Sequence, residues 1–389
     1  MKAPMNRLRH LRRDERGVSL LYVTTGFLSF FAATALAVDV GMLMTARSQA
    51  QNAADAGALS GAIALALDDF EDRTANGPAV SAAVSVAHEN IVIGEDVSVE
   101  PADVTFPAAP NGQFNRVRVL VYRNEARGNP LSTFISAVFG MDTAGIAAGA
   151  TAHAAPANAM TCVRPFTIPD KWEENQDPAW TMESVFRRYT NKGDLVPNPD
   201  RYYLPDDEAN YEGYDATEDK GTRLVLRAGG GSNIAPTFYY SWKMDDAVGG
   251  DFYRENISEC NQAVFEYESV MTQEPGNMVG PTVQGIEDLI LQDPNAYWED
   301  EPGCNCVKTD QARSPRVFPI PLYDPDLYDQ GKVNGRNATL IMRNWIGFFV
   351  EELNGNEVVG RITPILGTIN PDAGPAPAGV FPLAVQLVE

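Results

Sequence analysis

Histidine is scarce in this sequence, whose 389 residues include only His10, His88 and His153. A histidine-based zinc site and a Ser-His-Asp triad each need histidine beside other ligands or carboxylates, so either is hard to assemble here. No G-x-S-x-G motif occurs, and the glycine run at 229–232 lacks the Lys-Ser/Thr that completes a phosphate-binding loop. We therefore identify no catalytic, cofactor-binding or metal-binding residue and predict that the protein is not an enzyme.

Basic residues are also few, with 30 Lys and Arg against 52 Asp and Glu and a net charge of −22. This balance disfavours nucleic acid and anionic lipid surfaces as partners. Acidic clusters at 206–219 and 324–329 offer oxygen atoms of the kind that bind Ca²⁺, but neither has the EF-hand spacing, and such loops are usually solvated. No two carboxylates stand out as a pair for glycoside hydrolysis.

One run, residues 17–38, holds 22 positions without a charge. As an α-helix of about 33 Å it is long enough to cross a hydrocarbon core of about 30 Å. Six basic residues precede this run, whereas the stretch that follows it offers only Arg47 and Arg73. The positive-inside rule therefore places the leader 1–17 in the cytoplasm, a transmembrane helix at 18–38, and the rest of the chain outside.

Three alternatives remain open for the processing of the N-terminal leader. Ala35-Leu36-Ala37 has the A-x-A pattern of a secretory cleavage site, although the apolar stretch is longer than usual and the helical pattern continues through it. Cleavage after Gly17 would resemble prepilin processing, but Tyr22 stands where such sites usually carry Glu. The third alternative is that the leader is retained.

The helical pattern continues to residue 69, and its outer half is dominated by small residues. Ala53, Gly57 and Gly61 recur at every fourth position, which gives a flat stripe that another helix can approach closely. We predict helix packing at these three residues. The partner is either a separate subunit or the core of the chain's own domain, because alanine is also the best helix former.

The pattern after the long helix predicts two further regions. Residues 39–155 read as helix, helix, strand, strand, helix and strand, with the later elements at 79–90, 97–106, 114–123, 130–139 and 145–155. Residues 160–389 are rich in Pro, aromatic and acidic residues and contain short extended runs at 223–227, 316–320, 339–345, 347–350 and 358–362, with one helix at 283–292. The fold class is α+β, with a small α/β module followed by a mainly β, loop-rich domain.

All four cysteines, Cys162, Cys260, Cys304 and Cys306, lie in the second half. An exported domain permits disulfides, and four cysteines allow three pairings. Cys304 and Cys306 are close enough in sequence that a bond between them is expected to be strained. The favoured arrangements join Cys162 to Cys260, or join each of them to one member of the Cys304/Cys306 pair.

Three segments carry a family resemblance: Arg16-Gly17, the LAVDVG stretch at 36–41 and the QNAADAGALSGA stretch at 51–62. Together they resemble the N-terminal region of Tad (Flp) pilus-assembly TadG-like proteins, which are single-pass, pilin-related membrane proteins. The NPLSTFISAVFGMD segment at 129–142 extends the likeness. The chain lacks the D-x-S-x-S metal motif that some members carry in a von Willebrand A domain.

The resemblance implies a pilin-like module at 39–155 and an acidic periplasmic domain at 160–389, held by a single inner-membrane helix. It implies a structural role in assembling a Tad-type pilus, with other Tad or pilin-like membrane proteins as partners and no cofactor. The alternative is a secreted or surface hydrolase, or a calcium-dependent binding protein, that uses residues 160–389. The sequence leaves open the partner, the stoichiometry and the role of that domain.

Overall fold

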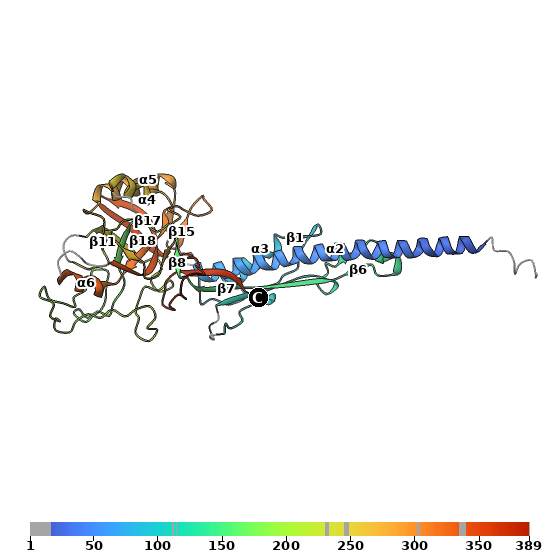
Figure 1. Cartoon of the computed structure of the whole chain (residues 1–389), viewed down its shortest axis with the longest axis horizontal. Coiled ribbons are helices and arrows are strands. Elements are labelled where there is room, and N and C mark those ends of the chain that lie inside the picture. Colours follow the sequence, from blue (N-terminus) through green and yellow to red (C-terminus); the bar gives the residue numbers. More distant parts are fainter. Residues whose placement is uncertain are drawn as a thin grey trace, which may run out of the picture.

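The computed structural model describes residues 17–110, 113, 115–229, 233–244, 249–301, 304–333 and 340–388. Figure 1 shows a long helix that is bare at its N-terminal end, lies along a thin module over its other half, and ends at a rounded domain. The architecture is α+β, which confirms the predicted class, and the second domain is built around a six-stranded barrel. The predicted cytoplasmic leader lies outside the described residues, apart from Gly17.

The long helix α2 spans Val18–Leu67, 50 residues, and so measures about 75 Å. Among its described side chains, Asp39 is the first that is buried, and everything before it is exposed. From Ala46 onward one face is buried within the module, and the second helix, α3, at Pro78–His88, packs on it around Gly57 and Gly61. Pro78 occupies the first turn of α3, where its missing N–H costs no hydrogen bond.

A four-stranded antiparallel sheet packs against the outer half of α2 beside α3, in the order β19-β7-β4-β3. β4 at Arg116–Arg123 alternates, with Val117, Val119 and Val121 fully buried against the helices. Alanines and a glycine fill β7, which lets α2 lie close to the sheet. The other strands and the short helices of the module are β1 Ile91–Val92, β2 Glu95–Asp96, η2 Pro101–Asp103, β3 Val104–Thr105, η3 Glu125–Arg127, β5 Leu131–Ser132, η4 Ser136–Phe139, β6 Thr143–Ala144, β7 Ile146–Pro156 and β19 Leu383–Val388.

One feature of this module differs from the sequence prediction, and another was not predicted. The expected helix at 130–139 is a strand-and-turn segment, with β5 paired to β6 and only η4 as a single 3-10 turn. The sheet also takes its edge strand, β19, from the C-terminus, within the range 160–389 that the sequence analysis assigned to the second domain. The pairing runs from Leu383 with Pro156 to Val388 with Thr151. The strand that leads into the second domain, β7, and the strand that returns from it, β19, are therefore neighbours in one sheet.

The barrel closes because β17 pairs with both β16 and β18 in the ring β17-β16-β9-β11-β10-β18. Two neighbouring pairs, β9 with β16 and β10 with β11, are parallel, and the others are antiparallel. Its strands are β9 Phe166–Pro169, β10 Arg223–Ala228, β11 Phe238–Ser241, β16 Val317–Tyr323, β17 Leu340–Asn354 and β18 Glu357–Thr363. The two predicted runs at 339–345 and 347–350 are therefore one strand.

Aromatic side chains fill the barrel domain. Phe166, Phe318 and Phe348 are almost fully buried, and neighbouring rings meet edge to face. Outside the barrel lie α4 Gly250–Ser258, α5 Val279–Gln292, α6 Pro325–Val333 and the short strands β8 Ala159–Met160, β12 Phe265–Glu266, β13 Val270–Met271, β14 Tyr297–Glu299 and β15 Cys306–Lys308. α5 confirms the helix predicted at 283–292, and long irregular segments account for much of the rest.

The four cysteines form two disulfides. Cys162 is bonded to Cys260, which is one of the favoured pairings. Cys304 is bonded to Cys306, a pairing that was not among the favoured arrangements. The physical reason is the turn between them: Asn305 adopts a positive φ of 44°, and the two Cα atoms lie 5.0 Å apart, within the range that a disulfide spans.

Candidate functional site

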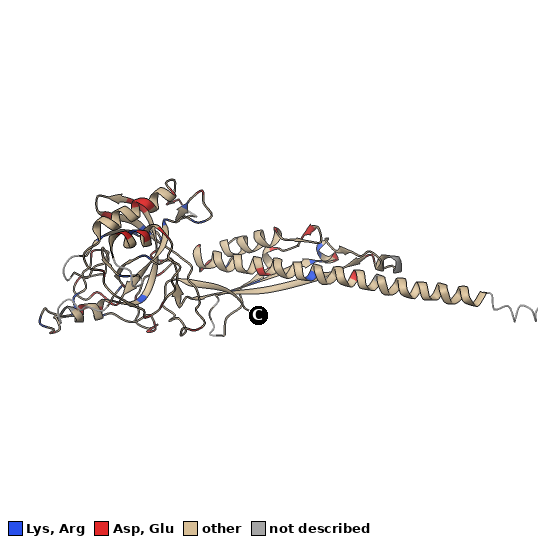
Figure 2. Cartoon of the chain, turned by 45° about the horizontal axis from the view of Figure 1, so that its top comes forward, with Lys and Arg blue, Asp and Glu red and all other residues tan. Residues whose placement is uncertain are grey.

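The N-terminal part of α2 is the most distinctive surface of the molecule. Its large apolar side chains are exposed all round the helix, with Leu20 72% and Leu28 63% accessible. The helix is long and apolar enough to cross a membrane by length and composition. Figure 2 shows this end as an uncharged stretch that projects beyond the rest of the molecule. No described part of the chain shields these side chains from solvent.

Four of the hydroxyl groups on this stretch are hydrogen-bonded within the helix itself. Thr24, Thr25, Ser29 and Thr34 each donate to the carbonyl oxygen four residues earlier, at 2.7–2.9 Å. A lipid environment offers no water to replace such bonds, so internal satisfaction is what a spanning helix needs. The polar residues within the run therefore do not count against a membrane location.

Asp39 holds the membrane-proximal loop of the module against α2. Its carboxylate accepts hydrogen bonds from the backbone N–H groups of Phe134 at 2.9 Å and Ser136 at 2.6 Å. The N–H of Ile135 at 3.2 Å and the Ser136 hydroxyl at 2.5 Å complete the set. These donors, the Ser136 hydroxyl foremost, lower the pKa of Asp39 to about 2, so the residue is ionised at neutral pH.

One feature of the sequence could have indicated this contact, although our sequence analysis did not use it. Asp39 is 3% exposed, and it is the first charged residue after the 22-residue uncharged run. A carboxylate buried in an otherwise apolar helix needs several donors, and a loop of free amides supplies them. Only the fold shows that these donors come from residues 95 or more positions away.

The predicted helix-packing residues Ala53, Gly57 and Gly61 lie inside the module. A Cβ added at Gly57 would lie 3.0 Å from the carbonyl oxygen of Ala83 and 3.0 Å from the Cβ of Ala87. The face is taken by the chain's own α3 and β4, so it is not available to a separate subunit in this structure. Of the two partners left open for the stripe, the contacts correspond to the module's own core.

The module and the barrel domain meet at the C-terminal end of α2. The Lys220 ammonium group donates to the carbonyl oxygens of Leu67 at 3.3 Å and Asp68 at 3.0 Å. A cation at this position satisfies helix carbonyls that have no partner within the helix, and it complements the helix dipole. The backbone from Gly379 to β19 is held from the barrel side, where Asn344 accepts from Phe381 N at 2.9 Å and donates to Gly379 O at 3.2 Å.

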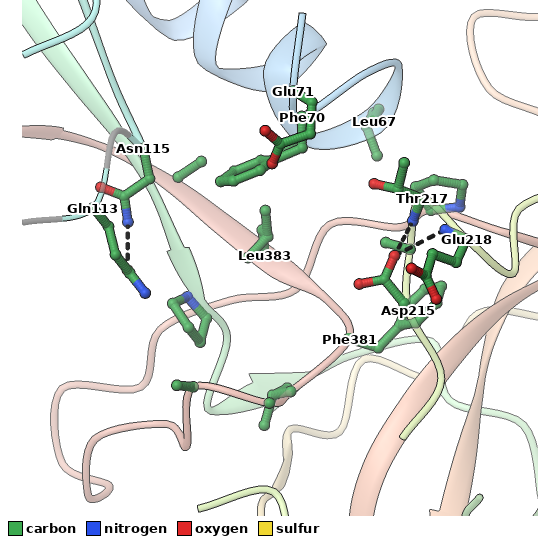
Figure 3. A pocket seen from close by; sticks show the side chains of 18 of the residues that line it. Leu67, Phe70, Glu71, Gln113, Asn115, Asp215, Thr217, Glu218, Phe381 and Leu383 are labelled. Carbon is green, nitrogen blue, oxygen red and sulfur yellow. Dashed lines mark hydrogen bonds between the residues drawn. The ribbon is translucent and has the colours of Figure 1, made fainter. Parts of the chain in front are cut away.

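A cleft of about 730 Å³ lies at this junction. Figure 3 shows Leu67, Phe70 and Glu71 from the end of α2 on one side. Phe381 and Leu383, at the start of the returning strand, line it from below. Gln113 and Asn115 lie at the left of this view and the Asp215 turn at the right. One carboxylate oxygen of Asp215, Oδ1, accepts from the N–H groups of Thr217 and Glu218 at 2.7 and 2.8 Å.

Comparison with known families finds a match in the N-terminal segment. The family described as Flp pilus-assembly TadE/G-like matches residues 17–64, which is nearly the whole of α2. The match covers residues 17–64 and no other part of the chain. No curated protein and no solved structure matches the chain.

The Tad match confirms the family resemblance, and the Tad family is a pilus-assembly family without enzymatic function. The matched segment comprises both the bare apolar stretch and the stripe that packs in the module. It ends three residues before α2 does, and the barrel lies beyond it. The Tad match therefore supports a pilus-related role. It carries no information about the barrel, which lies outside the matched residues.

The acidic clusters considered for Ca²⁺ are engaged in local structure. In the second cluster, Asp324 accepts from the N–H groups of Asp326 and Leu327 and lies 3.4 Å from the Arg343 guanidinium. Asp326 pairs with Arg188 at 3.0 Å. Within the described ranges, no three His, Cys, Asp or Glu side chains are grouped so that they could hold a metal ion.

Asp170 is a fully buried carboxylate of the barrel domain. Burial raises its pKa to about 6, in opposition to hydrogen bonds from the hydroxyl groups of Tyr211 and Tyr202, both at 2.8 Å. Tyr211 also accepts from the Asn344 amide at 2.8 Å. Asp170 is fully buried and lines none of the larger cavities of the described chain, so this network joins the loops 200–215 to the barrel wall.

Proposed function

We propose that this chain is a structural component in the assembly of a Tad-type (Flp) pilus. Residues 18–38 would anchor it in the inner membrane as a single span, with the N-terminus in the cytoplasm and the module and barrel in the periplasm. It would act by packing against other Tad pilus-assembly or pilin-like membrane proteins rather than by catalysis. The observation that carries the proposal is the Tad match on a helix whose first half is fully exposed.

The exposed half of α2 supports a helix-packing role better than the buried stripe does. Thr25, Ser29, Ala33 and Ala37 recur at every fourth position, and all four are exposed. In a membrane, small residues at this spacing let two helices approach closely, because no bulky side chain keeps their backbones apart. The expected partner contact therefore moves from Ala53, Gly57 and Gly61 to the bare span, where the chain supplies no partner of its own.

The test compares two sets of substitutions on opposite sides of the span. Ala33→Ile with Ala37→Ile adds bulk to the small-residue side and preserves hydrophobicity. Leu20→Ile with Val38→Ile is the matched control, because at 100° per residue those two exposed residues lie about 160° from the centre of the small-residue side. We expect both variants to fractionate with the inner membrane. We expect only the alanine variant to lose co-purification of pilus-assembly proteins and to lose pili.

Two results would count against the proposal. The first is a membrane-inserted alanine variant that still supports normal piliation. The second is recovery of the unmodified protein in the soluble fraction with an N-terminus at Val38, which would favour a secreted protein. N-terminal sequencing of the mature chain also separates a retained leader from cleavage after Gly17.

A further inference from the structure

We propose that the loop between β5 and β6, residues 133–142, is a second membrane contact that inserts Phe134 and Met141 into the interfacial layer beside the span. The inference rests on the proposed anchoring of residues 18–38 and adds to it a named lipid-facing surface. Its occupant is the headgroup and upper acyl region of the same bilayer leaflet. A neighbouring protein subunit is the alternative that the experiment below distinguishes.

The position of the loop is set by Asp39. Three consecutive backbone amides, at residues 134–136, are hydrogen-bonded to this one carboxylate. Asp39 immediately follows the uncharged run, so the loop lies beside α2 where the apolar stretch ends. Figure 1 shows the same relation, since the segment around β6 is the part of the module that extends farthest along α2 towards its N-terminal end. A span ending at residue 38 therefore brings this loop to the membrane surface.

The loop presents apolar side chains that nothing in the described chain covers. Phe134 is 69% exposed and Met141 is 59% exposed. Large exposed apolar side chains mark an interaction surface, and aromatic rings favour the membrane interface. The continuity of this surface with the exposed span identifies lipid as its partner.

The backbone of the loop is suited to a region that is poor in water. The N–H of Thr133 donates to Asp142 O at 3.1 Å, and the N–H of Met141 donates to Ser136 O at 3.1 Å. Gly140 N donates to Ala137 O at 3.0 Å, and Asp39 accepts from the three amides already described. Irregular backbone enters the interface at low cost only when its amides are paired in this way.

Charge does not drive this contact. The loop carries Asp142 and no basic residue, so attraction to anionic headgroups is absent from it. Insertion would rest on apolar burial, which salt does not screen. The contact should therefore form on zwitterionic vesicles and persist at high ionic strength.

The experiment places an environment-sensitive, thiol-reactive fluorophore at single new cysteines in the full-length protein. The four native cysteines are in disulfides and leave the new thiol as the labelling site. The positions are Phe134→Cys and Met141→Cys in the loop, Leu28→Cys in the span and Leu195→Cys on the barrel domain. Leu195 is the matched control, because it is 60% exposed and lies in the segment between β9 and β10 of the barrel domain. The protein is reconstituted in phosphatidylcholine vesicles with nitroxide-labelled lipids.

We expect several-fold stronger lipid-nitroxide quenching at 134 and 141 than at 195, at a shallower depth than at 28 and with no change in high salt. Asp39→Ala should reduce quenching at 134 and leave quenching at 28 unchanged, because the loop is released while the span stays inserted. Quenching at 28 without quenching at 134 or 141 overturns the loop contact and leaves the anchor intact. No quenching at 28 overturns the anchor itself. A third outcome is that the fluorophore at 134 shows no lipid quenching and is shielded from solvent only when other pilus proteins are present. That result would assign the surface to a subunit and refute the lipid contact.

Discussion

Replacing Gly61 by leucine tests whether the stripe on α2 belongs to the module's own core. A Cβ at this position would lie 2.8 Å from Val117 Cγ1, 3.0 Å from Ala83 Cβ and 3.1 Å from Ala79 O. Val117 and Ala83 are fully buried, so neither can move into solvent to make room. Leucine adds three further carbon atoms to the same space.

The magnitude follows from two opposing effects. Overpacking a filled core costs about 1–3 kcal/mol, and removing a glycine from a helix interior returns about 1 kcal/mol. The steric effect should win, because the nearest contacts involve the rigid α3 backbone and the sheet. A net loss of up to about 2 kcal/mol corresponds to a fall of up to about 8 °C in the melting temperature of the module. Gly61→Ala should cost less than Gly61→Leu, since its single carbon meets the close contact with Val117 but adds no further atoms.

The assay is thermal unfolding of the full-length protein in detergent, together with its abundance in cells. Gly41→Leu is the control, because no atom lies within 4 Å of the Cβ position there and only the gain in helix propensity remains. We expect Gly61→Leu to be less abundant and to melt earlier than both Gly41→Leu and the wild type. A Gly61→Leu protein as stable as wild type that has lost its partners would refute the internal role and restore the stripe as a docking face.

Three further outcomes are expected. Leu28→Arg with Phe30→Arg should add about 2.5–3.5 kcal/mol per residue to insertion and move the protein out of the membrane pellet, so retention there would refute the span. In the folded protein the pKa of Asp170 is about 6, above its ordinary value of 3.8. The free energy that Asp170 contributes to barrel stability is therefore fully present below about pH 4, and it is lost as the pH rises to about 6. Asp170→Asn should remove that decline in denaturant titrations, and an unchanged pH profile would contradict the burial argument. Removing the Cys162–Cys260 bridge should cost about 2–5 kcal/mol and slow the non-reduced band in electrophoresis, whereas identical mobility with and without reductant would argue against disulfides in the native protein.

Local patterns in the sequence were sufficient for the elements that depend on near neighbours. The uncharged run and the following small residues predicted one helix to residue 69, and α2 ends at Leu67. The alternation in residues 116–123 predicted β4, and the apolar spacing in 283–292 predicted most of α5. Each of these signals is a period of 2 or 3.6 residues, which the backbone imposes whatever the rest of the chain does.

Tertiary structure decided the features that join distant segments. The sequence could not show that residues 383–388 return to β7, because a sheet edge accepts any strand that its neighbours bring within reach. It could not show that β17 closes the ring on β18, or that α3 rather than another subunit covers Gly57 and Gly61. The turn that lets Cys304 bond to Cys306 and the amides that reach Asp39 are likewise set by the fold. Periodicity thus determines which elements form, whereas which elements cover one another depends on packing between residues that lie tens to hundreds of positions apart.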